Sequence, residues 1–246
     1  MKFEDMINTI QLGDCYELIK NIPDKSIDLV YIDIPYMVKN MDKGGGLLKN
    51  ETRKKLYHKE LIPIMQDIDY SIFKDLCRIM KYIYIYIWCS KEQIPKIINI
   101  FNKESINMEI LVWCKTNPTP FCCNTWLPNV EYCLLFREKS KTKLNDGYEL
   151  KSKYYLGQTN TADKKEYSHP TIKPLELVKR HILHSTQPND IVLDCFCGSG
   201  TTCLAAKETG RRYIGMEIDP EYHRIAVNRL NGITANGQMS IFSEFK

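Results

Sequence analysis

Short apolar runs alternate with helical patterns along most of the chain. The runs have the length of strands buried on both faces, and apolar residues between them recur at helical spacing. Such alternation builds βαβ units, so it predicts an α/β fold with a mostly parallel sheet and helices on both faces. The expected strands are 27–33, 82–88, 109–113, 130–136, 191–194 and 213–217, and the expected helices are 71–80, 91–102, 175–184, 201–209 and 220–230. We expect 130–136 to be the antiparallel edge strand that such sheets often carry.

The size and composition of the chain suit one enclosed core. With 246 residues, 43% of them hydrophobic, the chain can fill a single α/β domain, and we expect residues 1–246 to form it. The net charge of +4 is compatible with a nucleic-acid partner and equally with none. Charge alone therefore decides nothing about function.

The N-terminal residues and the cysteines predict a cytoplasmic protein. No apolar run follows Met1, so we expect no signal peptide, and no apolar segment approaches the roughly 20 residues that span a bilayer. The ten cysteines include no pair of Cys-x-x-Cys elements and lie mostly in apolar runs. We therefore expect reduced, buried thiols, no metal site and no membrane association.

Two polar segments interrupt the alternation. Residues 37–60 contain three consecutive glycines and seven basic residues against three acids, and residues 137–168 contain eight basic residues against five acids, with four tyrosines interleaved. Neither segment has a clear periodicity. They are interpreted either as solvated loops or as basic surfaces for a polyanion, with aromatic rings available for stacking.

A glycine-containing turn, residues 194–202, joins an expected strand to an expected helix. Glycines allow the backbone to approach a ligand closely, and the helix N-terminus presents free N–H groups to an anion. The turn lacks the Gly-Lys-Ser/Thr of a phosphate loop, and Cys203 stands where a dinucleotide fingerprint has its third glycine. A ligand site and a purely structural turn are both compatible with this pattern.

An acid follows the turn at a distance typical of ribose recognition. Glu217 ends the next expected strand, roughly 20 residues after the glycines, where a carboxylate can accept hydrogen bonds from ribose hydroxyls. Asp219 and Pro220 then have the pattern of a helix start, with Asp219 as N-cap and Pro220 at the first helical position. Asp219 thus has a structural explanation and Glu217 a functional one.

A second constellation, Asp33-Ile34-Pro35-Tyr36, follows the expected strand 27–33 directly. It places a carboxylate, a restricted backbone and an aromatic face at the carboxyl edge of the sheet, where α/β folds bind ligands. Taken alone, it is equally compatible with a tight turn after a strand.

In combination, these motifs resemble the β group of DNA amino-methyltransferases, in which the catalytic motif precedes the cofactor motif. Residues 33–36 are similar to that family's Asp-Pro-Pro-Tyr element, residues 169–174 to His-Pro-Thr-x-Lys-Pro, and residues 194–200 to Asp-x-Phe-x-Gly-Ser-Gly. Residues 13–15 lie where the family places the acid that holds the cofactor adenine. Residues 113–118 resemble a Trp-x-Lys-x-Asn-Pro stretch near the base pocket. The resemblance extends over about residues 10–231.

The resemblance implies a class I methyltransferase fold with a circularly permuted, mostly parallel seven-stranded sheet, and S-adenosylmethionine as cofactor. It also implies two groups of site residues. The catalytic group is Asp33, Ile34, Pro35 and Tyr36. The cofactor-binding group is Asp14, Cys15, His169, Thr171, Lys173, Asp194, Phe196, Gly198, Gly200, Thr201, Thr202 and Glu217.

The family's mechanism implies that a flipped base stacks on Tyr36, while Asp33 and the Ile34 carbonyl accept its two amino hydrogens. The family has proline where this chain has Ile34, so the fixed φ of proline is lost but a carbonyl is still present. Aspartate at the first motif position favours N6 of adenine. The alternatives are N4 of cytosine, and a catalytically weak DNA-binding relative.

The resemblance also implies partners. The expected substrate is double-stranded DNA, contacted by residues 37–60 and 137–168. A homodimer and a cognate restriction endonuclease are further expectations. Protein-glutamine and RNA methyltransferases use related four-residue elements, but the motif order and the sequence of residues 169–174 favour a DNA enzyme.

Overall fold

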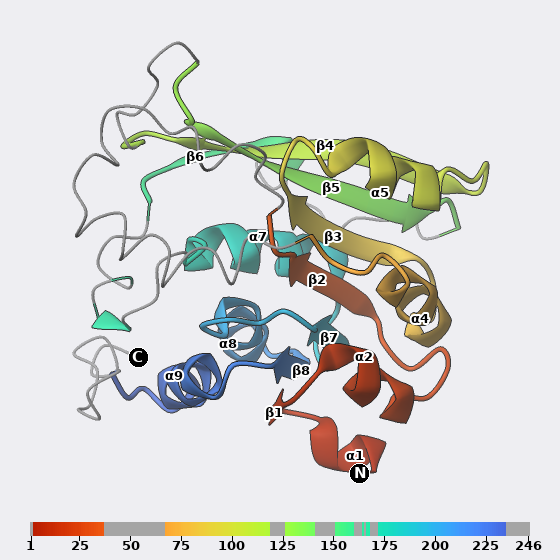
Figure 1. The fold of residues 1–246 in the computed structure, drawn as a ribbon, viewed down its shortest axis with the longest axis vertical. Coiled ribbons are helices and arrows are strands. Elements are labelled where there is room, and N and C mark those ends of the chain that lie inside the picture. The colour runs from red at the N-terminus through yellow and green to blue at the C-terminus, as the bar shows by residue number, and fades with distance from the viewer. Residues whose placement is uncertain are drawn as a thin grey trace.

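A computed structural model describes residues 2–36, 67–118, 126–140, 151–159, 164, 166–167 and 172–234 of the chain. Within these ranges the chain forms one eight-stranded sheet with helices on both faces, which confirms the expected α/β architecture (Figure 1). The strand order across the sheet is β1-β8-β7-β2-β3-β5-β4-β6. None of the described helices is long and apolar enough to cross a membrane.

The strands are β1 Thr9–Leu12, β2 Leu29–Asp33, β3 Tyr84–Cys89, β4 Ile106–Lys115, β5 Val130–Glu138, β6 Tyr154–Gly157, β7 Ile191–Asp194 and β8 Arg212–Glu217. The helices are α1 Phe3–Met6, α2 Cys15–Leu18, the 3₁₀ helix η1 Ile19–Asn21, α4 Ile72–Ile79, α5 Ile94–Phe101, α7 Leu175–Ser185, α8 Thr201–Glu208 and α9 Pro220–Leu230. Every strand and helix expected from the sequence is present, with bounds within a few residues.

Strand β5 runs antiparallel to the other strands, as expected, but its predicted position was wrong. It lies inside the sheet, between β3 and β4, and pairs with both. Four consecutive buried residues, 133–136, explain this, because an interior strand is covered on both faces.

The sheet has one strand more than the seven that the resemblance implies. Strand β6 pairs in parallel with the end of β4 and forms one edge of the sheet. It lies within residues 137–168, which were interpreted as irregular, so that interpretation was wrong for this stretch. Alternating exposed and half-buried residues are what an edge strand with one solvated face shows. The circular permutation stays a prediction.

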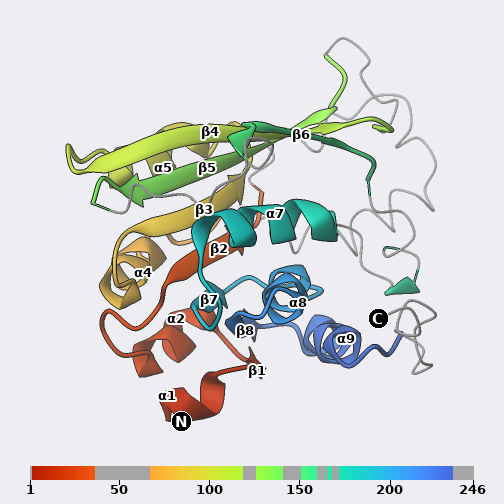
Figure 2. The same cartoon turned by 180° about the vertical axis from the view of Figure 1, so that it is seen from behind.

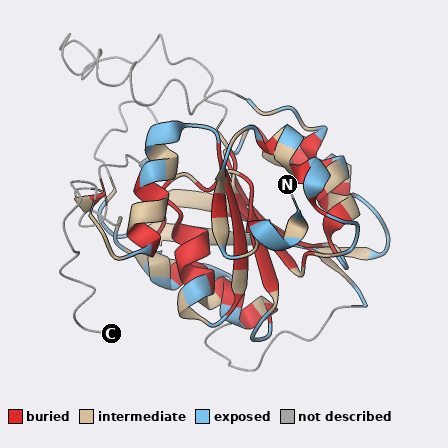
Figure 3. Cartoon of the chain, turned by 90° about the horizontal axis from the view of Figure 1, so that it is seen from below, coloured by how far each residue is buried: buried red, intermediate tan, exposed pale blue. Residues whose placement is uncertain are grey.

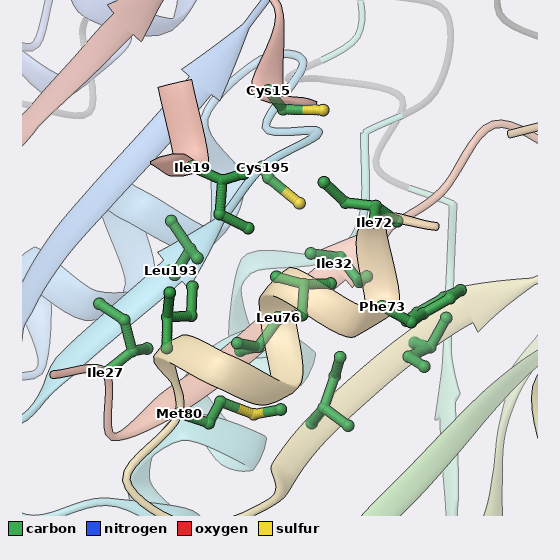
Figure 4. Close-up of a cluster of buried hydrophobic side chains, with 14 of the residues drawn as sticks. Cys15, Ile19, Ile27, Ile32, Ile72, Phe73, Leu76, Met80, Leu193 and Cys195 are labelled. Atoms are coloured by element: carbon green, nitrogen blue, oxygen red, sulfur yellow. The ribbon is translucent and has the colours of Figure 1, made fainter. Parts of the chain in front are cut away.

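The core consists of two apolar layers, one on each face of the sheet. Alternation along β2 directs Val30 and Ile32 to one face, and Leu29 and Tyr31 to the other. The first layer packs under α1, η1, α4 and α5, and the second under α7, α8 and α9 (Figures 2 and 3). Figure 4 shows the first layer, where α4 side chains meet residues of the sheet. Each fully buried large side chain stabilises the fold by about 1.5–3 kcal/mol.

Four parallel neighbours, β1, β8, β7 and β2, have their carboxyl ends at one edge of the sheet. Leu12 of β1 pairs with Glu217 of β8, while Asp194 and Asp33 are the last residues of β7 and β2. Four turns that carry most of the predicted site residues therefore meet at this edge, as the parallel topology requires.

Candidate active site

One cavity of about 340 Å³ lies at the carboxyl ends of these strands. Both groups of predicted site residues contribute to it. The predicted residues that line it are Asp14, Cys15, Asp33, Ile34, Pro35, Tyr36, Lys173, Asp194, Phe196, Gly198, Thr201, Thr202 and Glu217. His169 and Thr171 lie outside the described residues. The volume is within the range of about 300–1,000 Å³ that is usual for small-molecule sites.

Gly200 is the one predicted residue in the described ranges that does not line the cavity. It lies before α8 with φ of 75°, a conformation that favours glycine. A Cβ there would lie 3.1 Å from the Ala226 Cβ of α9. Gly200 therefore allows the turn to bend and α9 to pack closely, which supports the site indirectly.

Asp194 organises the start of the glycine turn. Its Oδ1 accepts a hydrogen bond from the Phe196 N–H at 3.0 Å, so the chain turns sharply after β7. The side chain is buried, and burial raises the pKa of Asp194 to about 7, while hydrogen bonds from Thr202 and Phe196 oppose the rise. A carboxyl group with such a pKa can change its charge near neutral pH.

Glu217 links two turns that line the cavity. Its Oε2 accepts from the Gly198 N–H at 2.8 Å, and its Oε1 accepts from the Asp219 N–H at 2.9 Å. Burial raises the pKa of Glu217, and these N–H groups oppose the rise. Each carboxylate oxygen has a second lone pair, so Glu217 can still accept hydrogen bonds from a ligand.

The acid near the start of the chain lies beside Glu217. The Gly13 N–H donates to the Glu217 carbonyl at 2.8 Å, and Asp14 then caps α2 by accepting from the Tyr16 N–H at 2.9 Å. At the other side of the Glu217 turn, Asp219 accepts from the N–H groups of residues 221 and 222, which confirms the predicted N-cap of α9. Both acidic turns thus have defined backbone geometry.

The backbone at residues 33–36 is held by contacts from the neighbouring strand and helix. The Ile34 N–H donates to the Trp88 carbonyl at 3.2 Å, and the Ile34 side chain is buried in the core. Gln93, fully buried before α5, donates from Nε2 to the Pro35 carbonyl at 2.9 Å and accepts from the Ser90 N–H at 3.0 Å. These contacts restrict the backbone at a position where the family has proline.

Asp33 and Tyr36 share a network of ionised groups with Lys173. The Lys173 Nζ lies 2.5 Å from Asp33 Oδ2, 3.0 Å from Glu131 Oε2 and 3.2 Å from the Tyr36 hydroxyl. The Tyr36 hydroxyl donates to Glu131 Oε2 at 3.1 Å, and Lys115 Nζ lies 2.6 Å from Glu131 Oε1. The Asp33 Oδ1 is shielded from solvent and accepts no hydrogen bond from any residue in the described ranges.

Among the residues that sequence reasoning missed are Glu131, which lines the cavity, and Gln93, which holds the backbone at residues 33–36. Glu131 is a carboxylate near the start of an otherwise apolar strand, which was a usable signal because strand interiors rarely bury an unpaired charge. Gln93 precedes an amphipathic helix and had no such signal. Lys115, which forms an ion pair with Glu131, belongs to residues 113–118, the stretch for which the resemblance implies a place near the base pocket.

Comparison with known proteins adds to this geometry. A family model described as DNA methylase matches residues 27–228, which is most of the chain. The chain belongs to the DNA methylase family. Among its relatives is the type II methyltransferase M.HinfI of Haemophilus influenzae, 34% identical over 94% of this chain and 70% of that protein.

Solved structures also match this chain in fold. The crystal structure of the M1.HpyAVI–SAM complex matches 90% of this chain and 98% of that chain, with a TM-score of 0.60 and 27% identity. The PvuII DNA methyltransferase, which is cytosine-N4-specific, matches 93% of each chain with a TM-score of 0.68 and 18% identity. At that identity the second match shows likeness of fold alone.

Proposed function

We propose that this DNA methylase transfers a methyl group from S-adenosylmethionine to the N6 amino group of adenine in double-stranded DNA. The observation that carries the proposal is that one cavity is lined by both the glycine turn and residues 33–36. A methyl donor and an acceptor amine bound in one cavity have the proximity that the reaction requires.

The cofactor half of the cavity suits S-adenosylmethionine. That cofactor supplies an electrophilic methyl group on a positively charged sulfonium. Asp194, Glu217 and Asp14 place carboxylates around this half, which favours a cationic ligand, and the N-terminus of α8 can receive the cofactor's carboxylate. Glu217 would hold the ribose and Asp14 the adenine amino group. The SAM complex of M1.HpyAVI, a protein of similar fold, supports this assignment.

The base half of the cavity suits an exocyclic amine. Asp33 Oδ1 is a shielded acceptor without a donor in the described ranges, so it can accept an amino hydrogen. The Ile34 carbonyl would accept the second hydrogen, and the Tyr36 ring would stack on the flipped base. Two acceptors favour a tetrahedral nitrogen whose lone pair faces the methyl group, which is catalysis by positioning and electrostatics.

The contacts around residues 34 and 35 favour an active enzyme over a catalytically weak relative. Proline would fix φ at this position, whereas here the Trp88 carbonyl and the Gln93 amide hold the neighbouring peptides. The geometry that the reaction needs therefore does not depend on proline.

Adenine is favoured by the aspartate at the first position of the motif, and N4 of cytosine is the second candidate. The measurement is methyl transfer to unmodified duplex DNA, followed by digestion to nucleosides and mass spectrometry. We expect N6-methyladenine. N4-methylcytosine as the only product would contradict the adenine assignment and leave the methyltransferase assignment intact, whereas no methylated base at all would contradict both.

A homodimer and a restriction endonuclease partner are also proposed. Pairing with a second copy would extend the DNA-contacting surface beyond that of one chain. Light scattering at micromolar concentration tests the dimer, and a monomeric mass with and without DNA would reject it. Mapping methylated sites in a host without other methylation defines the sequence that a partner endonuclease would share.

A further inference from the structure

Lys173 is a buried ammonium group between two carboxylates at the base end of the cavity. Its contacts are to Asp33 and Glu131, and its charge lies 5.3 Å from the Tyr36 ring centre and 5.2 Å from that of Trp88. Only 8% of the residue is exposed. Asp33, Glu131 and Tyr36 line the cavity, and none of the four contacted residues belongs to the glycine turn.

We propose that Lys173, anchored by Glu131, is the positioning residue that fixes Asp33 and Tyr36 for reaction with the target base. This inference rests on the proposed function. It differs from the role that the sequence resemblance implies for Lys173, which is cofactor binding.

The two oxygens of Asp33 have different surroundings, which is the basis of the proposal. Lys173 binds Oδ2, so the carboxylate cannot rotate without breaking a charge-assisted hydrogen bond, and Oδ1 is left without a donor in the described ranges. An oxygen fixed in this way can be aimed at one amino hydrogen, and a misplacement of 1 Å can cost roughly 10²-fold in rate.

Glu131 extends the same restraint to the stacking ring. Its Oε2 accepts from both Lys173 and the Tyr36 hydroxyl, so one carboxylate oxygen sets the distance between the ammonium group and the ring. Lys115 pairs with the other oxygen and balances the charge of Glu131. Asp33, Glu131, Lys173 and Lys115 together are neutral, so the cluster can stay ionised although it is largely buried.

Electrostatics at Asp33 agree with this arrangement. Burial raises the pKa of Asp33, Glu131 adds to the rise, and the Lys173 ammonium opposes it. Lys164 also lies near the cluster, and burial together with Lys115 lowers its pKa. Removing the Lys173 charge should therefore raise the pKa of Asp33 further and protonate the acceptor at a higher pH.

The test compares Lys173→Met with Lys179→Met in steady-state methylation and in calorimetric titration with S-adenosylmethionine. Lys179 is a matched control because it lies on α7 and forms an ion pair with Glu208 at 2.7 Å, away from the cavity. We expect Lys173→Met to lower kcat by roughly 100-fold while cofactor affinity changes little. The acid limb of its pH–kcat profile should move to higher pH, and Lys179→Met should behave as the unmodified protein.

A double-mutant cycle with Asp33→Asn separates positioning from general destabilisation. If Lys173 acts through Asp33, adding Lys173→Met to Asp33→Asn lowers kcat little further. If Lys173→Met does not fold, Glu131→Gln replaces it and should lower kcat without weakening cofactor binding. Both variants are checked by thermal unfolding.

Two results would overturn the inference while leaving the proposed function intact. One is weaker cofactor binding in Lys173→Met with an unchanged kcat at saturating cofactor, which would make Lys173 a cofactor contact. The other is full additivity in the cycle, with the acid limb unmoved. Failure of the unmodified protein to methylate DNA would instead contradict the proposed function itself.

Discussion

Asp194 shows how burial gives a single carboxyl group a role beyond its hydrogen bonds. Its pKa of about 7 results mainly from burial, with further rises from Asp33 and Glu217, which line the same cavity. Because the pKa in the folded protein exceeds that of the unfolded chain, this group favours folding most at low pH, and that contribution is lost as pH rises towards 7. Folding thus favours protonated Asp194, whereas a cationic ligand favours the ionised form of this carboxyl group.

We therefore expect S-adenosylmethionine to bind more tightly as pH rises from 6 to 8, with release of a proton from Asp194. Calorimetric titration at pH 6.5 in buffers of different ionisation enthalpy measures the released proton. S-adenosylhomocysteine has a neutral sulfur and should show a weaker dependence. Asp194→Asn is the control and should remove most of the effect. Equal affinity for the cofactor at pH 6 and pH 8 would contradict this role of Asp194.

At the scale of elements, the sequence predicted the strands and helices of the core and missed those at its margins. Buried runs such as β7 and the amphipathic α9 have the predicted bounds, because burial on one or both faces imposes a regular pattern. Strands β1 and β6 are four residues long and partly exposed at the two sheet edges, so their patterns are weak. Residues at strand ends could be predicted as site residues from motifs and topology.

The residues that hold the site from other elements could not be predicted in the same way. Gln93 reaches the Pro35 carbonyl across 58 residues of sequence, and Glu131 reaches the Tyr36 hydroxyl across 95. Such contacts follow from how the strands are ordered in the sheet, with β5 inserted next to β3, and that order was not expected. The local sequence pattern therefore predicted the residues that line the cavity better than the residues that hold them in place.

The contact between Gln93 and the loop after β2 gives a prediction for this pair of elements. Gln93→Leu removes the donor to the Pro35 carbonyl and to Asp67 Oδ1 and the acceptor of the Ser90 N–H, and leaving such groups unpaired costs about 1–3 kcal/mol in the free energy of unfolding. The Pro35 carbonyl belongs to the peptide that orients Tyr36, so we expect kcat to fall while cofactor affinity is retained. Chemical denaturation and steady-state methylation measure the two effects.

Gln187→Leu serves as the control for Gln93→Leu, because Gln187 is exposed in the connection between α7 and β7. It should change neither stability nor kcat appreciably. If Gln93→Leu lost stability but kept its kcat, Gln93 would support the fold without orienting the motif. If cofactor affinity fell as much as kcat, the loop after β2 would contribute to the cofactor site as well.

For the whole molecule, the distribution of charge is more informative than its total. Residues 37–60 and 137–168 have net charges of +4 and +3, so the rest of the chain is net negative, at −3. The second segment includes the end of β5 and all of β6, at the edge of the sheet beyond β3, whereas residues 37–60 lie outside the described residues. In the sequence, this basic segment directly follows residues 33–36, which line the base end of the cavity.

This distribution predicts that DNA binding depends on salt through the basic segments. Each lysine that contacts a phosphate displaces counterions, so the slope of log K against log salt concentration changes by about 0.9 for each lost contact on duplex DNA. We expect neutralising Lys54 and Lys55 together, as glutamines, to reduce the slope by up to about twice that amount.

Lys25 and Lys103 are the matched control pair, because both are exposed and precede the amino ends of β2 and β4, at the opposite edge of the sheet from the cavity. Fluorescence anisotropy with a labelled duplex from 50 to 300 mM salt measures both pairs. A slope that moves equally for the two pairs would indicate nonspecific attraction by total charge, and a slope that moves for neither would remove Lys54 and Lys55 from the DNA-contacting surface.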